Sequence, residues 1–61
     1  MKCSELLRLL RQDGWFIVNQ RGSHIRLLHP TKQGIIFFPF HGSSEMAKGL
    51  EIKIKKMAGL L

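Results

Sequence analysis

The sequence has 61 residues, which limits it to one small domain with a small core. A chain of this size has no room for a deep substrate cleft, so any activity must lie on an exposed face or be completed by a partner. Hydrophobic residues make up 44% of the chain and charged residues 23%, a balance that is typical of a folded domain and excludes a disordered tail.

The charge of the chain is strongly positive. Ten Lys and Arg against four Asp and Glu give a formal net charge of +6. We expect an acidic partner, and nucleic acid first, because basic side chains that neutralise phosphates release bound counterions. A membrane surface, an acidic protein surface and a role in solubility alone are the alternatives. No apolar run approaches the ~20 residues of a membrane span, and no signal peptide is expected before the first helix.

Cys3 is the only cysteine, so neither an internal disulfide nor a thiolate zinc cluster can form. This pattern favours a reducing compartment, and we expect the cytoplasm. Nothing in the sequence marks Cys3 as an activated nucleophile.

The segment SELLRLLRQDG, residues 4–14, is predicted to form an amphipathic helix with Ser4 as its N-cap and Gly14 at its end. Its leucines follow helical spacing, three on one face and the last at the margin: Leu6, Leu7, Leu10 and Leu9. The solvent side carries polar residues that form either a plain solvated face or a phosphate-contacting one: Arg8, Arg11 and Gln12.

Three strands are predicted next, with the sequences WFIVNQ (15–20), HIRLLH (24–29) and IIFFPF (35–40). The turn RGS joins the first two, and its Gly22 is free to adopt a positive φ. Pro39 cannot donate a hydrogen bond to a sheet ladder, so it marks an edge or a strand end. Trp15 is expected in the core more than as a base-stacking ring. Short connections predict an antiparallel meander.

After the irregular segment HGSSEMAKG, residues 41–49, a second helix is predicted to end at Gly59. Four apolar residues define its buried face: Leu50, Ile54, Met57 and Ala58. Three lysines suit the negative end of its dipole: Lys53, Lys55 and Lys56. The predicted fold is α+β over residues 1–61, in the order α-β-β-β-α, with a three-stranded antiparallel sheet and both helices on one face. The other face is left open, where a basic domain can meet RNA.

Strand alternation predicts that His24 and Arg26 lie on this open face, while Ile25, Leu27 and His29 point to the core. An imidazole exchanges its proton near cellular pH, and a neighbouring guanidinium binds phosphate, so the pair has the chemistry that RNA cleavage needs. Two ordinary surface residues are the alternative. The three histidines do not form a metal-binding set, so we expect no metal and no other cofactor.

Four stretches, SELLRLLRQDGW, RGSHIRLLHP, FPFHGSSEMAKG and IKKMAGLL, occur in an order and spacing that resemble HicA-type toxins, the mRNA interferases of toxin–antitoxin systems. The resemblance covers nearly the whole chain. It implies a fold similar to a double-stranded RNA-binding domain, and it implies that His24, in the Gly-Ser-His turn, is the catalytic histidine. It also implies a HicB-type antitoxin that blocks the active face.

The third predicted strand departs from the family pattern, in which the positions of Ile35 and Phe37 are often polar. We interpret both as part of an exposed apolar patch for the antitoxin. The alternative is a different strand register, with these two residues in the core.

The resemblance at the Gly-Ser-His turn, which alone favours an enzyme over a binding module, therefore leads us to expect a metal-independent endoribonuclease that cleaves mRNA. His24 would take the proton of a ribose 2′-OH while Arg26 and nearby lysines stabilise the developing charge. The residues expected to bind RNA are Arg21, Gly22, Ser23 and Arg26. No general acid is evident, because His29 is predicted to face the core and His41 lies in a loop. A non-catalytic module that binds structured RNA by shape is the main rival, and a basic protein-interaction domain is the third reading.

Overall fold

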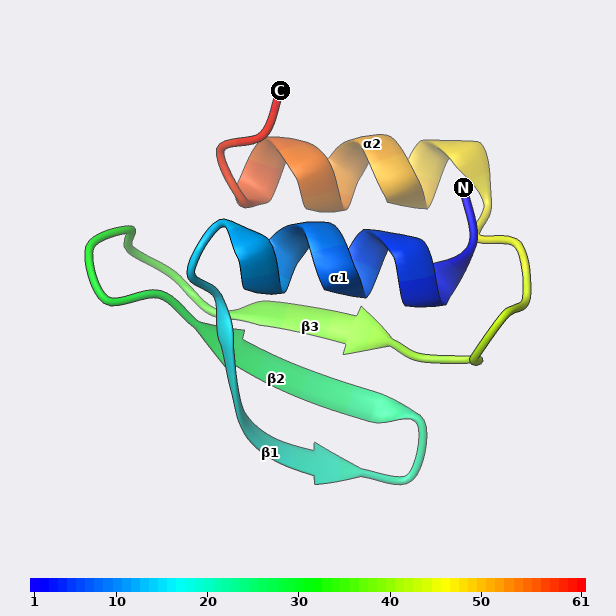
Figure 1. Ribbon diagram of the computed structural model, residues 1–61, viewed down its shortest axis with the longest axis horizontal. Helices are drawn as coiled ribbons and strands as arrows, with labels where there is room; N and C mark the ends of the chain where they lie inside the picture. Colours follow the sequence, from blue (N-terminus) through cyan, green and yellow to red (C-terminus); the bar gives the residue numbers. More distant parts are fainter.

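The computed structural model describes residues 1–61 as two helices and three strands (Figure 1). In chain order these are α1 (Cys3–Gln12), β1 (Phe16–Arg21), β2 (His24–Leu28), β3 (Ile36–Pro39) and α2 (Lys48–Met57). The predicted order α-β-β-β-α is confirmed. Neither helix has the length and apolar character that crossing a bilayer would require.

The strands form one antiparallel sheet in the order β1-β2-β3. Only Gly22 and Ser23 separate β1 from β2, and Gly22 has a φ of +60°, as the sequence predicted. Glycine at the first of two turn residues is the pattern of a type II′ hairpin, whose twist matches that of the strands. β3 is an edge strand and ends at Pro39, which also agrees with the prediction. Within β1 the register shifts between Ile17 and Asn19, which leaves Val18 as a bulge.

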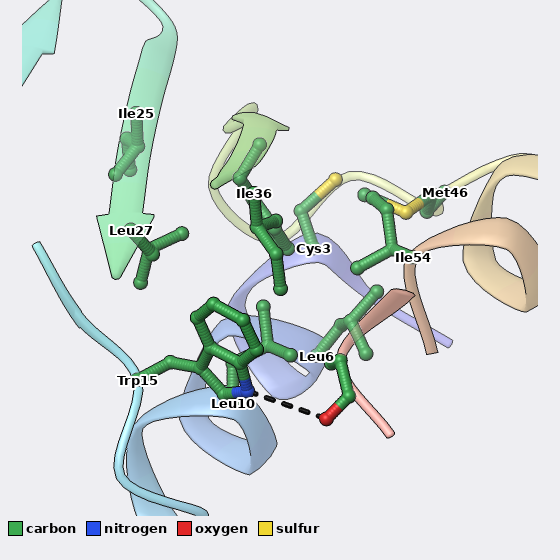
Figure 2. Packing of buried hydrophobic residues seen from close by; sticks show 11 residues of the cluster. Cys3, Leu6, Leu10, Trp15, Ile25, Leu27, Ile36, Met46 and Ile54 are labelled. Carbon is green, nitrogen blue, oxygen red and sulfur yellow. Dashed lines mark hydrogen bonds between the residues drawn. The ribbon is translucent and has the colours of Figure 1, made fainter. Parts of the chain in front are cut away.

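The core lies between one face of the sheet and the two helices (Figure 2). The sheet contributes alternate residues of β2 and β3, which are Ile25, Leu27, Ile36 and Phe38. The helix layer contributes Leu6 and Leu10 of α1, Ile54 of α2, and Ala58, the residue that caps the end of α2. Trp15, just before β1, is 2% exposed, and its Nε1 donates a hydrogen bond to the Ala58 carbonyl oxygen at 3.4 Å. The expectation that Trp15 belongs to the core is confirmed.

Both helices cover the same face of the sheet and run side by side in the same direction (Figure 1). Polar contacts join them at both ends. At the first end, the amino group of Met1 contacts Glu51 of α2 at 2.5 Å. At the other, Lys32 Nζ donates to Asp13 Oδ2 at 2.6 Å and to the Ala58 carbonyl at 2.9 Å. The opposite face of the sheet is left uncovered, as the sequence predicted.

The N-cap of α1 lies two residues before the expected one, so the prediction of Ser4 as the N-cap is wrong. Lys2 occupies the cap, and Ser4 lies inside the helix. The free amides of the first turn find partners elsewhere, because the backbone N–H of Cys3 donates to the Ser44 carbonyl and that of Ser4 to the Gly42 carbonyl. The loop before α2 therefore satisfies the first two helix amides, and the Glu5 carboxylate accepts a hydrogen bond from the amide of the cap residue, Lys2, at 3.0 Å.

The buried face of α2 also differs from the prediction. Leu50 and Met57 are 36% and 48% exposed, whereas Glu51 is buried beside Ile54. Glu51 accepts hydrogen bonds from the amino group of Met1 and from Lys55 Nζ, and these contacts, the first more strongly, lower its pKa to about 2. The paired carboxylate of Glu51 thus lies on the buried face of α2, where the apolar pattern had predicted the side chain of Leu50.

Candidate active site

The short β1–β2 turn places His24 at the first position of β2. Along this strand the side chains alternate, so His24 and Arg26 are exposed while Ile25 and Leu27 are buried. The predicted orientation of His24 and Arg26 toward the open face is confirmed. One residue, Ile25, lies between them, and the two steps along the strand span about 7 Å.

Arg21 pairs directly with His24 across the hairpin. Their Cα atoms are therefore only about 4.5–5.5 Å apart. Arg21, His24 and Arg26 line one open hollow of about 590 Å³. The other residues of its wall are Asn19, Gln20, Ile25 and Phe37. The structure thus brings the predicted catalytic histidine and both predicted RNA-binding arginines into one site, which we call the histidine hollow.

The histidine hollow carries positive charge that no acidic group offsets. Neither Arg21 nor Arg26 takes part in an ion pair. The four acidic residues all lie outside the sheet: Glu5, Asp13, Glu45 and Glu51. The hollow is therefore suited to a phosphate and lacks carboxylate oxygens.

Gly22 and Ser23, the other two residues predicted to bind RNA, form the turn at the end of the hollow and do not line it. Gly22 is exposed. Ser23 is half-buried, and its carbonyl oxygen accepts a hydrogen bond from the Phe40 amide at 2.6 Å. This bond ties the turn to the chain after β3 and so fixes the start of β2. Their direct contact with RNA stays a prediction.

An apolar zone continues the open face beyond the hollow. Phe37 is 59% exposed and pairs with Arg26, and Ile35 is 43% exposed. Phe16 pairs with Leu28 at the same end of the sheet. Phe38, next to Phe37, is fully buried, so the alternative register with Phe37 in the core is wrong. We call Phe16, Leu28, Ile35 and Phe37 the apolar zone.

Phe37 belongs to both the apolar zone and the histidine hollow. The guanidinium carbon of Arg26 lies 5.5 Å from the centre of its ring, within the range of a cation–π contact. The ring therefore stands beside the cationic end of the site.

The remaining histidines lie outside the hollow. The ring of His29 is 7% exposed and packs edge-on against Trp15, with 5.1 Å between ring centres. Its Nδ1 accepts hydrogen bonds from the amides of Thr31 and Lys32, which places the ring proton on Nε2, 2.7 Å from the Asp13 carbonyl oxygen. The predicted inward orientation of His29 is confirmed, and its role is structural.

His41 is exposed in the loop after β3, and it lines a different small hollow together with Cys3, Leu50 and other residues. No group of three or more His, Cys, Asp and Glu side chains lies close enough together to hold a metal ion. The expectation that lysines sit near His24 is wrong, because no lysine lines the histidine hollow. Its cationic groups are both arginines.

Asn19 is a site residue that the sequence reasoning missed. It pairs with Arg26 and lines the hollow. The signal was present, because a two-residue turn that pairs Arg21 with His24 also pairs residue 19 with residue 26. A second basic hollow, on α1, is lined by Arg8 and Arg11 with three neighbours. It lies on the helix layer and not on the open sheet face.

Comparison with known proteins adds two similarities. Residues 3–60 match a family described as the HicA toxin of bacterial toxin-antitoxin systems. The chain is also 38% identical over 60 residues to the "Probable mRNA interferase HicA" of Pseudomonas fluorescens (strain Pf0-1). That alignment covers 98% of this chain and 97% of the Pseudomonas protein.

Proposed function

The chain belongs to the HicA toxin family of bacterial toxin-antitoxin systems, and we propose that it is an endoribonuclease toxin that cleaves mRNA in the cytoplasm with His24 as its catalytic residue. The observation that carries the proposal is the histidine hollow, in which an exposed imidazole stands between two unpaired guanidinium groups. Residues 1–61 act in this proposal as one toxin domain.

The proposed reaction uses the 2′-OH of the RNA as the nucleophile. Neutral His24 takes the 2′-OH proton, the 2′-oxygen attacks the adjacent phosphorus, and the bond from phosphorus to the 5′-oxygen breaks. Arg21 and Arg26 stabilise the charge that develops on the phosphate oxygens. The products are a 2′,3′-cyclic phosphate and a 5′-hydroxyl, whose proton comes from water because neither His29 nor His41 lines the hollow.

The proposed chemistry needs no metal ion. Its two charge-stabilising groups are guanidinium groups and its base is an imidazole, and water protonates the leaving 5′-oxygen, so no step calls on a metal ion. The hollow contains no carboxylate that would hold a divalent cation. We therefore expect cleavage to persist in EDTA.

A HicB-type antitoxin is the proposed protein partner, with Ile35 and Phe37 in its interface. These residues are exposed, apolar and next to the histidine hollow, so a protein that covers them also covers His24. Binding to the folded toxin alone would raise the apparent stability of the toxin by mass action. Phe37→Thr should loosen the complex and leave the free toxin folded.

The decisive test compares purified wild-type chain with His24→Ala on end-labelled RNA, with cleavage and binding measured separately. His24→Ala should lower the cleavage rate by about 100-fold or more, because positioned proton transfer contributes about 10²–10⁴-fold. It should keep the circular dichroism spectrum and RNA binding. His41→Ala is the matched control, an exposed histidine outside the hollow, and should cleave as the wild type does.

Arg26→Ala should weaken RNA binding and cleavage together. The slope of the logarithm of the binding constant against the logarithm of the salt concentration should become less steep by about one. RNA that carries 2′-deoxyribose at the cleaved nucleotide should bind and resist cleavage. If His24→Ala cleaves at the wild-type rate, the assignment of His24 fails. RNA binding without cleavage by the wild type would instead favour the non-catalytic RNA-binding module.

A further inference from the structure

The open face combines three kinds of side chain in one hollow: a proton-exchanging imidazole, guanidinium groups and an aromatic ring. The first two act on a phosphate and its ribose, but a phenyl ring has neither a hydrogen-bond donor nor a positive charge with which to bind a phosphate. Phe37 is the most exposed aromatic residue of the chain, and it lines the hollow with Arg26 and His24. An antitoxin interface accounts for exposed apolar surface at Ile35 and Phe37, but it does not account for an aromatic ring inside the hollow beside Arg26.

We propose that Phe37 stacks on an unpaired base of the substrate, so that this site acts on single-stranded RNA. The inference rests on the proposed nuclease function and adds the class of RNA. A base presents its flat face to a protein only where it is not stacked between neighbours, which is why aromatic residues on sheet surfaces recognise single strands. In an A-form duplex the base faces are covered, and Phe37 would meet only the sugar-phosphate backbone.

The geometry fits one nucleotide. Arg26 and Phe37 face each other across β2 and β3, and His24 lies two residues along β2 from Arg26, about 7 Å away. Phe37 and His24 are thus diagonal neighbours across this strand pair, about 7–8 Å apart, which is comparable with the reach from a base to the phosphate of its own nucleotide. A base on Phe37 would therefore place the adjoining phosphate among Arg26, Arg21 and His24.

The contact between Arg26 and Phe37 supports this arrangement. The guanidinium lies 5.5 Å from the ring centre, which holds the ring beside the positive charge, while 59% of the residue surface stays exposed. The open sheet face has no acidic residue, because none occurs between residues 14 and 44. The nearest surroundings of the ring are thus attractive to a polyanion, which favours RNA as the occupant.

Phe16 provides a matched control. It is 46% exposed and paired with Leu28 in the apolar zone, yet it does not line the histidine hollow. Phe16→Leu and Phe37→Leu therefore each remove one phenyl ring from the open sheet face. Only the ring of Phe37 lies in the hollow that contains His24. Phe37→Tyr keeps a ring at the position and serves as the rescue variant.

The test measures equilibrium binding to a labelled single strand and a matched duplex, both 2′-O-methylated so that no 2′-OH is available for cleavage. Phe37→Leu should lose about 5- to 150-fold in single-strand affinity, the range that one stacked base contributes. Its duplex affinity should match that of the wild type, and Phe16→Leu and Phe37→Tyr should bind the single strand as the wild type does.

Single-strand affinity that does not change in Phe37→Leu overturns the stacking proposal, as does an equal loss in Phe16→Leu or on the duplex. Such results leave the nuclease proposal intact as long as unmodified RNA is still cleaved in a His24-dependent way. A wild-type chain that binds neither RNA and cleaves none would instead refute the proposed function itself. Circular dichroism of each variant shows whether it is folded.

Discussion

Replacing His29 tests whether the two strand-end histidines have different roles. His24 stands on the open face, whereas the ring of His29 is 7% exposed and joins the end of α1 to the loop after β2. His29→Ala removes the acceptor of two backbone amides, those of Thr31 and Lys32, and the partner of the Asp13 carbonyl oxygen. It also removes the edge-on contact with Trp15.

The magnitude follows from these contacts. Each hydrogen bond contributes about 0.5–1.5 kcal/mol net, and an aromatic pair about the same. Water can replace the ring at the exposed Thr31 amide, so we expect His29→Ala to cost about 2–4 kcal/mol. A domain of this size has a free energy of unfolding of roughly 3–9 kcal/mol, and 1 kcal/mol shifts its midpoint by about 4–8 °C. The midpoint should therefore fall by roughly 10–30 °C.

The assay is thermal and urea unfolding followed by circular dichroism, with His24→Ala measured beside it. His24→Ala should stay within about 0.5 kcal/mol of the wild type, as is usual for exposed positions. His29→Asn should fall between His29→Ala and the wild type, because the Asn oxygen can still accept from the loop amides. Wild-type stability in His29→Ala, or a comparable loss in His24→Ala, would refute these roles.

Two further substitutions test features that local sequence patterns do not reveal. Gly14→Ala should lower the free energy of unfolding in urea more than Gly22→Ala does. Both glycines have a positive φ, but only at Gly14 would the new Cβ lie 2.8 Å from His29 Nε2, so equal losses of stability would contradict this. Glu51→Gln should be less stable than the wild type at neutral pH. That difference should shrink as pH falls from 4.5 to about 2, where the wild-type carboxylate becomes protonated, whereas parallel pH curves would contradict the pairing of Glu51.

The sequence predicted the open-face site because its geometry is local. Two turn residues fix where β2 begins, and alternation then decides which side chains share a face. His24 and Arg26 follow from these rules alone, and the exposure of Phe37 follows from the next strand. Asn19 follows from the same hairpin once the register is written out.

The features that sequence reasoning missed depend on partners far along the chain. Ser4 has the right chemistry for a cap, but the carbonyls of Gly42 and Ser44 already satisfy the amides at the helix start. Glu51 breaks the apolar period of α2, and its burial depends on the amino group of Met1, 50 residues away, together with Lys55 one turn along the helix. The apolar periodicity predicts that a carboxylate such as Glu51 faces solvent. The buried face of α2 was therefore predicted to include Leu50 in place of Glu51.

The bulge at Val18 bears on self-association. β1 has a free edge and begins with three exposed apolar residues, Phe16, Ile17 and Val18, which together make a template for the strand of another molecule. The bulge interrupts the ladder between Ile17 and Asn19 and bends the strand, so an incoming strand meets no long regular edge. Deleting Val18 would leave each remaining β1 residue opposite its present β2 partner. The shortened chain would therefore keep its chemistry and lose its protection against aggregation.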